Sequence, residues 1–156
     1  MKTPQDLKII PFEEKYAADF KQINEAWLGS LFEITASDKK ALNNPVDEII
    51  NKEGHIFLAI HKDNILGCFA LEKVNQTTYM LSRMGVNADY QGLKIGQKLV
   101  DIGIAKAREL HAEKLILYTS HQLVKAINLY FKNGFKAVHV GKAPVNRATL
   151  KMEKSL

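Results

Sequence analysis

The sequence predicts an α/β fold, more exactly mixed α+β, with one central, mostly antiparallel sheet of about six to seven strands and helices on both faces. Two observations lead to this prediction. Residues 54–86 have the pattern of three consecutive strands joined by short turns, which is a meander. Residues 96–154 instead alternate between helical and strand patterns, which adds helices and further strands to the same sheet.

The N-terminal part predicts one strand and three helices. Residues 7–11 form a short apolar run that Pro11 closes. Residues 12–28 then carry apolar side chains at spacings of three and four, which predicts an amphipathic helix; these are Tyr16, Phe20, Ile23 and Trp27. Ser37 is the expected N-cap of a short helix over 38–42, and Pro45 is expected to open another that Gly54 ends.

The middle part predicts the meander. Strands are expected over 55–60, 65–73 and 77–86, with turns at residues 63–64 and 75–76. Cys68, the only cysteine of the chain, lies in the second of these strands, among apolar residues. We therefore expect a buried core thiol, and a single cysteine excludes an intramolecular disulfide.

The last third predicts two helices and three strands. Residues 96–110 and 124–132 have apolar stripes at helical spacing, and residues 114–119 resemble a strand buried on both faces. Further strands are expected over 135–140 and 148–154, with 142–146 as a loop. No linker or repeat interrupts the pattern, so residues 1–156 are predicted to be one domain.

Composition and charge exclude several classes of protein. The chain has 156 residues and a net charge of +5, but its lysines are scattered and lack the interleaved aromatic residues of nucleic-acid binders. No apolar run approaches the ~18 residues of a membrane span, and residues 1–6 lead into no secretory signal. No histidine and acidic residues have metal-ligand spacing. We therefore expect a cytoplasmic protein with no nucleic-acid, membrane or metal partner.

Residues 90–96 join a predicted strand to a long helix and contain two glycines, Gly92 and Gly96. Glycine lets a ligand approach the backbone closely, and amides at a helix N-terminus are unpaired and partly positive. Such a place binds phosphate, and Lys94 and Lys98 would add attraction. The same pattern also fits a tight strand-to-helix turn without a ligand. It lacks the endings of a Walker loop and of a dinucleotide fingerprint.

Two motifs carry a family resemblance. Residues 91–96, Gln-Gly-Leu-Lys-Ile-Gly, resemble the Arg/Gln-x-x-Gly-x-Gly/Ala signature of the GNAT superfamily of acetyl-CoA-dependent N-acetyltransferases. Residues 126–135 look like the Asn-x-x-Ala-x-x-x-Tyr…Gly-Phe block of that family. The resemblance is sharp over 79–140. Lys94 replaces a usual glycine, and we expect its backbone to be helix-compatible; Leu123 replaces a common asparagine. Both departures are expected to weaken cofactor binding.

The resemblance implies a site for acetyl-CoA as cosubstrate. Main-chain amides of residues 91–96 would hold the pyrophosphate, and the backbone of Met84 and Val86 would bind the acetyl carbonyl and the pantetheine arm. Gly85 would keep the approach open, and Tyr130 would protonate the departing thiolate. The implied cofactor-binding residues are Met84, Gly85, Val86, Gln91, Gly92, Leu93, Lys94, Ile95, Gly96, Gln97, Ala126 and Tyr130.

The proton donor and the base have separate interpretations. A phenol such as Tyr130 can donate a proton as the catalytic residue, although an i,i+4 core contact with Ala126 would also explain it. A base is harder to find, because residues 79–83 contain no carboxylate. Glu72, Glu33 and a relaying water remain as candidates, ahead of His55 and His61.

The leading hypothesis is an N-acetyltransferase that moves an acetyl group to a primary amine, on a small molecule or on a protein. The alternative is a non-catalytic acyl-CoA-binding module, suggested by Lys94, by Leu123 and by the missing base. Nucleic-acid binding is a third class that only the charge favours. Either a monomer or a homodimer is compatible with the sequence.

Overall fold

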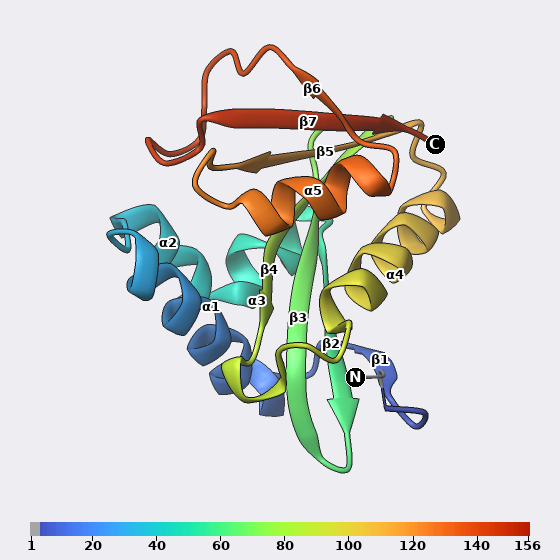
Figure 1. Cartoon of the computed structure of the whole chain (residues 1–156). Helices are drawn as coiled ribbons and strands as arrows, with labels where there is room; N and C mark the ends of the chain where they lie inside the picture. The colour runs from blue at the N-terminus through green and yellow to red at the C-terminus, as the bar shows by residue number, and fades with distance from the viewer. Residues whose placement is uncertain (1–3) are drawn as a thin grey trace.

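Seven strands form one mixed sheet in the computed structural model, which describes residues 4–156 (Figure 1). Residues 1–3, the start of the segment for which no secretory signal is predicted, lie outside the described residues. The strands lie in the order β1-β2-β3-β4-β5-β7-β6. Their bounds are β1 Lys8–Pro11, β2 His55–His61, β3 Asn64–Lys73, β4 Thr78–Val86, β5 Lys114–Thr119, β6 Lys136–Val138 and β7 Leu150–Ser155.

The pairing confirms a mostly antiparallel sheet. Strands β1 to β4 pair antiparallel in sequence, with β2, β3 and β4 as the predicted meander. The β4–β5 pair is parallel. Helix α4, Ile95–Glu109, separates the two strands in sequence and returns the chain to the end of the sheet at which β4 began. Strand β7 then inserts between β5 and β6, antiparallel to both.

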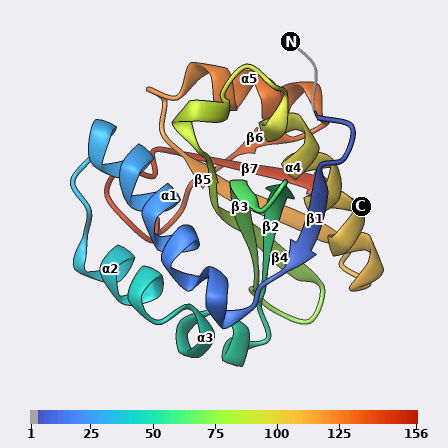
Figure 2. The same cartoon turned by 90° about the horizontal axis from the view of Figure 1, so that it is seen from below.

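Helices cover both faces of the sheet, as predicted (Figure 2). The helices α1, α2 and α3 lie on one face, which we call the α1–α3 face, and α4 and α5 lie on the other, the α4–α5 face. Their bounds are α1 Ala17–Leu31, α2 Ala36–Asn43, α3 Pro45–Glu48, α4 Ile95–Glu109 and α5 Val124–Lys132.

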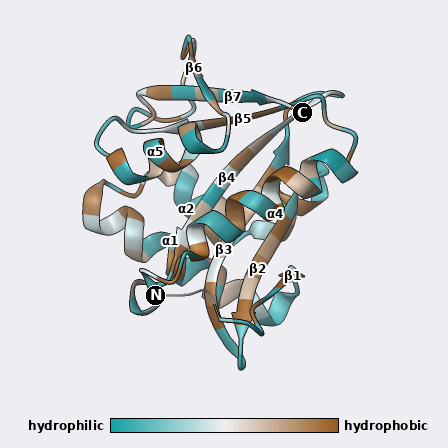
Figure 3. Cartoon of the chain, turned by 45° about the vertical axis from the view of Figure 1, so that its right-hand side comes forward, coloured by the Kyte–Doolittle hydropathy of each residue, from teal (hydrophilic) through white to brown (hydrophobic). Residues whose placement is uncertain are grey.

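The strand period of two divides the core between the faces. In β2, Ile56 and Leu58 pack with Phe20 of α1, whereas Phe57 and Ala59 belong to the cluster that contains the buried side of α4. Hydrophobic and hydrophilic residues alternate along α4, as expected for a helix with one face against the sheet (Figure 3). Cys68 is fully buried on the α1–α3 face, which confirms the predicted core thiol.

Several predicted boundaries are wrong. The first helix begins at Ala17, after a 3-10 turn, and continues to Leu31. The N-cap of α2 is Thr35 and not Ser37: the Asp38 amide donates to Thr35 Oγ1 (3.1 Å), and the Thr35 amide donates to Asp38 Oδ2 (3.0 Å). This capping box requires an acidic or amide side chain three residues after the cap, which only Thr35 has in this segment. The strand expected over 135–140 is shorter, Lys136–Val138, and the one expected over 148–154 is shifted to Leu150–Ser155.

Candidate functional site

The strands β4 and β5 part in the middle of the sheet. Their ladder joins Thr78–Met80 to Lys114–Ile116 and is the only pairing between the two strands in residues 4–156. The remainder of β4, residues 81–86, therefore has no sheet partner on its β5 side. Figure 1 shows β5 and β7 turned across the direction of β3 and β4. An unpaired strand edge offers N–H and C=O groups to an extended ligand.

A β-bulge lies in this unpaired part of β4. Cys68 of β3 pairs with Gly85 and Ala70 with Ser82, so two residues of β4, Arg83 and Met84, lie opposite one residue of β3. The backbone of Arg83 is left-handed, with φ of 50°. Bulges of this kind redirect side chains and are common beside active sites. Met84 and Val86 lie in this unpaired part of β4, and their partly buried side chains pack against the core cluster of the α4–α5 face.

Packing within the chain explains the glycine at position 85 without a ligand. A Cβ atom at this position would lie 2.8 Å from Trp27 Cδ1 and 2.9 Å from Ile23 Cγ2, both on α1. The space that a side chain would take is therefore filled by α1, and it is not open to a ligand. Glycine is required here because α1 packs directly onto the backbone of β4.

The N-terminus of α4 follows β4 across the predicted phosphate loop. Gln91 and Gly92 are exposed, and Gly92 has φ of 84°. Lys98 is the first residue of α4 whose amide donates a hydrogen bond along the helix, to Lys94 O at 3.2 Å. The amides of residues 95–97 precede it and have no such partner within the helix. This is the arrangement that favours an anionic group.

Lys94 does not have the predicted helix-compatible backbone. It is the N-cap of α4 with φ of 59° and ψ of 28°, which is the left-handed conformation that glycine adopts most easily. The lysine thus adopts a backbone conformation that favours glycine, at a cost in strain of roughly 1–2 kcal/mol.

Helix α5 lies against this end of α4. The side chains of Gln97 and Asn133 exchange two hydrogen bonds, with Nε2–Oδ1 at 2.8 Å and Nδ2–Oε1 at 3.1 Å. The side chain of Gln97 thus ties the two helices together, and only its main chain remains for a ligand. Ile95 is buried in the core, and Leu93 packs against the same cluster. At Gly96, a Cβ would meet only Leu129 Cδ2, at an ordinary 3.6 Å.

Tyr130 lies on α5, where its ring packs edge-on against Phe135 with the ring centres 5.8 Å apart. Burial raises the pKa of its phenol to about 12, so the proton is retained at neutral pH. Ala126 is half-buried one turn earlier on the same helix. Leu123 precedes the helix as its N-cap and supplies no side-chain acceptor to the first turn.

The sequence analysis missed one buried charge cluster. Asp38 of α2 is completely buried and accepts hydrogen bonds from Arg83 of β4 and from Arg147, which lies before β7. Burial alone would raise the pKa of Asp38, but hydrogen bonds from Arg147, Arg83 and Thr35 hold it well below its ordinary value. No local pattern reveals this cluster, because the partners are 45 and 109 residues from Asp38 along the chain.

The candidate bases differ in position. Glu72 of β3 is half-buried and accepts a short hydrogen bond from Ser82 Oγ of β4. Glu33 is exposed in the connection between α1 and α2. His55 is stacked with Phe57, and burial lowers its pKa. His61 Nδ1 lies 2.7 Å from Asp6 Oδ1, on the β1–β2 side of the sheet.

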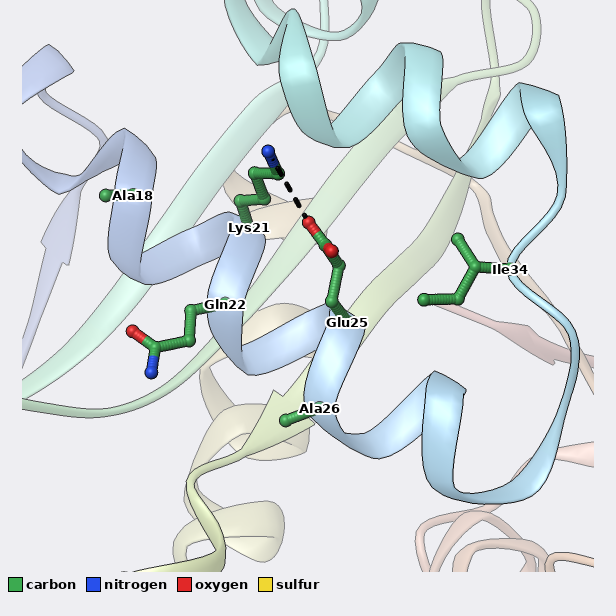
Figure 4. A pocket seen from close by; sticks show the side chains of 6 residues that line it. All are labelled: Ala18, Lys21, Gln22, Glu25, Ala26 and Ile34. Carbon is green, nitrogen blue, oxygen red and sulfur yellow. Dashed lines mark ion pairs between the residues drawn. The ribbon is translucent and has the colours of Figure 1, made fainter.

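Two hollows lie along α1. The larger, about 450 Å³, is on the outer side of the helix beside Ile34, and the ion pair between Lys21 and Glu25 (3.7 Å) crosses it (Figure 4). It contains none of the predicted site residues. The smaller, about 300 Å³, lies between α1 and the end of β4 and reaches Val86 and Gln91. Only this hollow borders the predicted cofactor segment.

Within residues 4–156, no three histidine, cysteine or acidic side chains gather closely enough to hold a metal ion. None of the helices in this part of the chain combines the length and apolar character that a membrane crossing requires.

Comparisons with known proteins identify the family. The model of the acetyltransferase (GNAT) family matches residues 14–135, most of the chain. The chain is 36% identical over 52 residues to mycothiol acetyltransferase of Geodermatophilus obscurus, which is 33% of this chain and only 17% of that protein's length. The fold is similar to the GNAT family acetyltransferase of Staphylococcus aureus Mu50, with a TM-score of 0.86, 25% identity and coverage of 96% and 99% of the two chains.

A third similar structure is the PaiA N-acetyltransferase of Thermoplasma acidophilum in complex with coenzyme A. Its TM-score is 0.77 at 17% identity, with coverage of 97% of this chain and 100% of that one. The chain therefore belongs to the acetyltransferase (GNAT) family, and the resemblance seen in its two motifs is confirmed.

Proposed function

We propose that residues 1–156 form a single transferase domain that moves the acetyl group of acetyl-CoA to an amine. The observation that carries this proposal is the unpaired end of β4 directly before the N-terminus of α4. One segment thus offers hydrogen-bonding groups for an extended arm and free amides for a diphosphate, which are the two ends of one ligand.

The residues present fit coenzyme A. Amides of residues 91–96 would hold its pyrophosphate, and the backbone of Met84 and Val86 would align the pantetheine arm and the acetyl carbonyl. Gly96 supports this placement, because packing within the chain leaves room for a Cβ there and does not by itself require glycine. The PaiA structure, which contains coenzyme A, has the same fold. Bound acetyl-CoA would supply the activated acyl group.

In the proposed reaction, the amine nitrogen attacks the thioester carbonyl carbon and the carbon–sulfur bond breaks. A backbone N–H of β4 would stabilise the oxyanion, and Tyr130 would donate the proton that the departing thiolate takes. Because the pKa of Tyr130 is raised, its phenol is protonated at neutral pH and carries the proton that the thiolate takes. The proton lost by the amine balances the proton delivered to sulfur.

Glu72 is the base that we propose. It lies on β3 opposite Met80, and its carboxylate accepts a hydrogen bond from Ser82 Oγ, which lies in the unpaired part of β4. The register pairs Glu72 with Met80, which belongs to the segment 79–83, where β4 itself has no carboxylate. Glu33 is exposed on the α1–α2 connection, and a water relaying the proton is the remaining candidate.

Two measurements test the proposal. Calorimetry with CoA and acetyl-CoA measures binding, and release of free thiol from acetyl-CoA with a panel of amines measures turnover. We expect saturable binding of both ligands and amine-dependent thiol release. Binding without thiol release for every amine would favour the acyl-CoA-binding module, which the substitutions at Lys94 and Leu123 suggest. Absence of binding at millimolar ligand would exclude both functions.

A further inference from the structure

Two guanidinium groups share one buried carboxylate where β4 and β5 part. Arg83 Nη1 donates to Asp38 Oδ1 at 2.6 Å. Arg147 donates to both oxygens, with Nη1–Oδ2 at 2.7 Å and Nη2–Oδ1 at 2.8 Å. Because both arginines bond to Oδ1, the carboxylate holds their guanidinium groups side by side.

The charges of this cluster do not cancel. Arginine stays protonated in proteins, and the lowered pKa of Asp38 keeps its carboxylate ionised. Within residues 4–156, neither guanidinium forms an ion pair with another carboxylate, so two positive charges meet one negative charge. Asp38 is 0% exposed, whereas each arginine side chain remains 18% exposed. Nε and Nη2 of Arg83 have no hydrogen-bond acceptor among the described residues.

The two arginines come from β4 and from the connection that leads into β7, beside the end of β5. Arg83 lies in the unpaired segment of β4. Arg147 lies two residues before Thr149, whose amide donates to Thr119 O at the end of β5 (3.0 Å). Asp38 therefore connects both strands on the α1–α3 face, opposite α4 and α5. The excess positive charge lies at this junction.

The backbone of β4 is strained to bring Arg83 there. Side chains alternate between faces along a regular strand, so Ser82 and Arg83 would point to opposite sides. The bulge and the left-handed φ of 50° let Arg83 reach Asp38 of α2 on the α1–α3 face. Ser82, opposite Ala70 on that same face, holds Glu72. Two consecutive residues of β4 thus place opposite charges on this face: Ser82 binds the carboxylate of Glu72, and Arg83 carries the guanidinium.

We propose that the acceptor is an amine that also carries a carboxylate. Arg83, with Arg147 beside it, binds that carboxylate through the planar guanidinium fork, and Glu72 receives the proton of the amine. The two arginines are then specificity-determining residues, and Asp38 is the residue that positions them. This inference rests on the proposed N-acetyltransferase function.

The test compares amino acids with their carboxamides as acceptors in the thiol-release assay. A carboxamide has the less basic amine and so more of the neutral nucleophile, so ionisation of the amine cannot favour the acid. We expect kcat/KM to be about tenfold or more higher for the acid. Arg83→Gln should remove this preference mainly through KM, and Arg83→Lys should restore part of it, because lysine keeps the charge without the fork.

Arg108→Gln, which removes the same charge from the exposed end of α4, is the matched control and should keep the preference. Equal kcat/KM for acids and carboxamides in the unaltered protein overturns the inference, whatever the stability of the variants. The inference is also overturned if Arg83→Gln lowers kcat/KM equally for amino acids and for their carboxamides. If no amine of any charge releases thiol, the proposed function itself fails and the inference falls with it.

Discussion

Replacement of Gly96 by alanine should stabilise the free protein and weaken its binding of CoA. Gly96 is the second residue of α4 and has no positive φ. The added Cβ would meet only Leu129 Cδ2 at 3.6 Å, an ordinary van der Waals distance, so the fold can accept it. Alanine is better than glycine in a helix by up to about 1 kcal/mol.

The magnitudes follow from these contacts. A gain of up to about 1 kcal/mol should raise the Tm by about 2–4 °C in a chain of this size. In the complex, the same methyl group would occupy the space in which we place the pyrophosphate. Overpacking typically costs about 1–3 kcal/mol, which would weaken CoA binding by about 5- to 150-fold. The free protein and the complex should thus respond in opposite directions.

Calorimetric titration with CoA and thermal unfolding without ligand measure the two effects. Gly29→Ala is the matched control: Gly29 lies in α1, where a Cβ would meet only Ile34 Cδ1 at 3.5 Å. This control should gain similar stability and keep its affinity for CoA. The reasoning is refuted if Gly96→Ala binds CoA as tightly as the unaltered chain, because the phosphate would then lie elsewhere.

Three further predictions concern single residues. Lys94→Gly should raise the Tm by about 2–8 °C in thermal unfolding, because glycine relieves a left-handed strain of roughly 1–2 kcal/mol; a lower Tm would show that the lysine makes compensating contacts. Tyr130→Phe should lower kcat in the thiol-release assay by about 100-fold or less with CoA affinity nearly unchanged, and an unaltered kcat would remove Tyr130 from the mechanism. With its pKa near 12, deprotonation of Tyr130 should cause no loss of rate between pH 7 and about 10. Asp38→Asn should lower the free energy of unfolding at pH 7 by about 3–5 kcal/mol in urea titrations, because it leaves two partly buried arginines without their carboxylate. Since the pKa of Asp38 is lowered by folding, its stabilisation is present above the ordinary carboxyl pKa and is lost as the pH falls below about 4. The variant should lack that part of the acid dependence, and a parallel pH profile would contradict this assignment.

Local patterns were sufficient for the elements and for the family. The meander, the apolar stripes of α4 and α5 and the run of β5 depend on periods of two and 3.6 residues, which the side chains of each segment record by themselves. The two motifs, residues 91–96 and 126–135, lie at the start of α4 and on α5, with β5 between the two helices. Their order and spacing along the chain therefore identified the GNAT family before any tertiary contact was considered.

The backbone conformation and packing of single residues were harder to predict from the sequence. Lys94 was expected to avoid the left-handed region because it has a side chain, but the turn into α4 imposes that conformation on whichever residue occupies it. Gly85 was explained by a ligand, whereas Trp27 and Ile23 of α1 fill the space above it. The conformation of Lys94 depends on the geometry of a tight turn, and the packing of Gly85 depends on a helix that its own sequence segment does not contain.

The sequence by itself thus determined the strands, the helices and the candidate cofactor segment, since each depends on residues close together in the chain. Only the tertiary structure decided where β4 leaves β5 and which charges meet at that junction. Asp38, Arg83 and Arg147 carry no common motif and come from a helix, a bulged strand and the connection that precedes β7. Burial brings them together, because a carboxylate removed from water must find its partners wherever the packed chain places them.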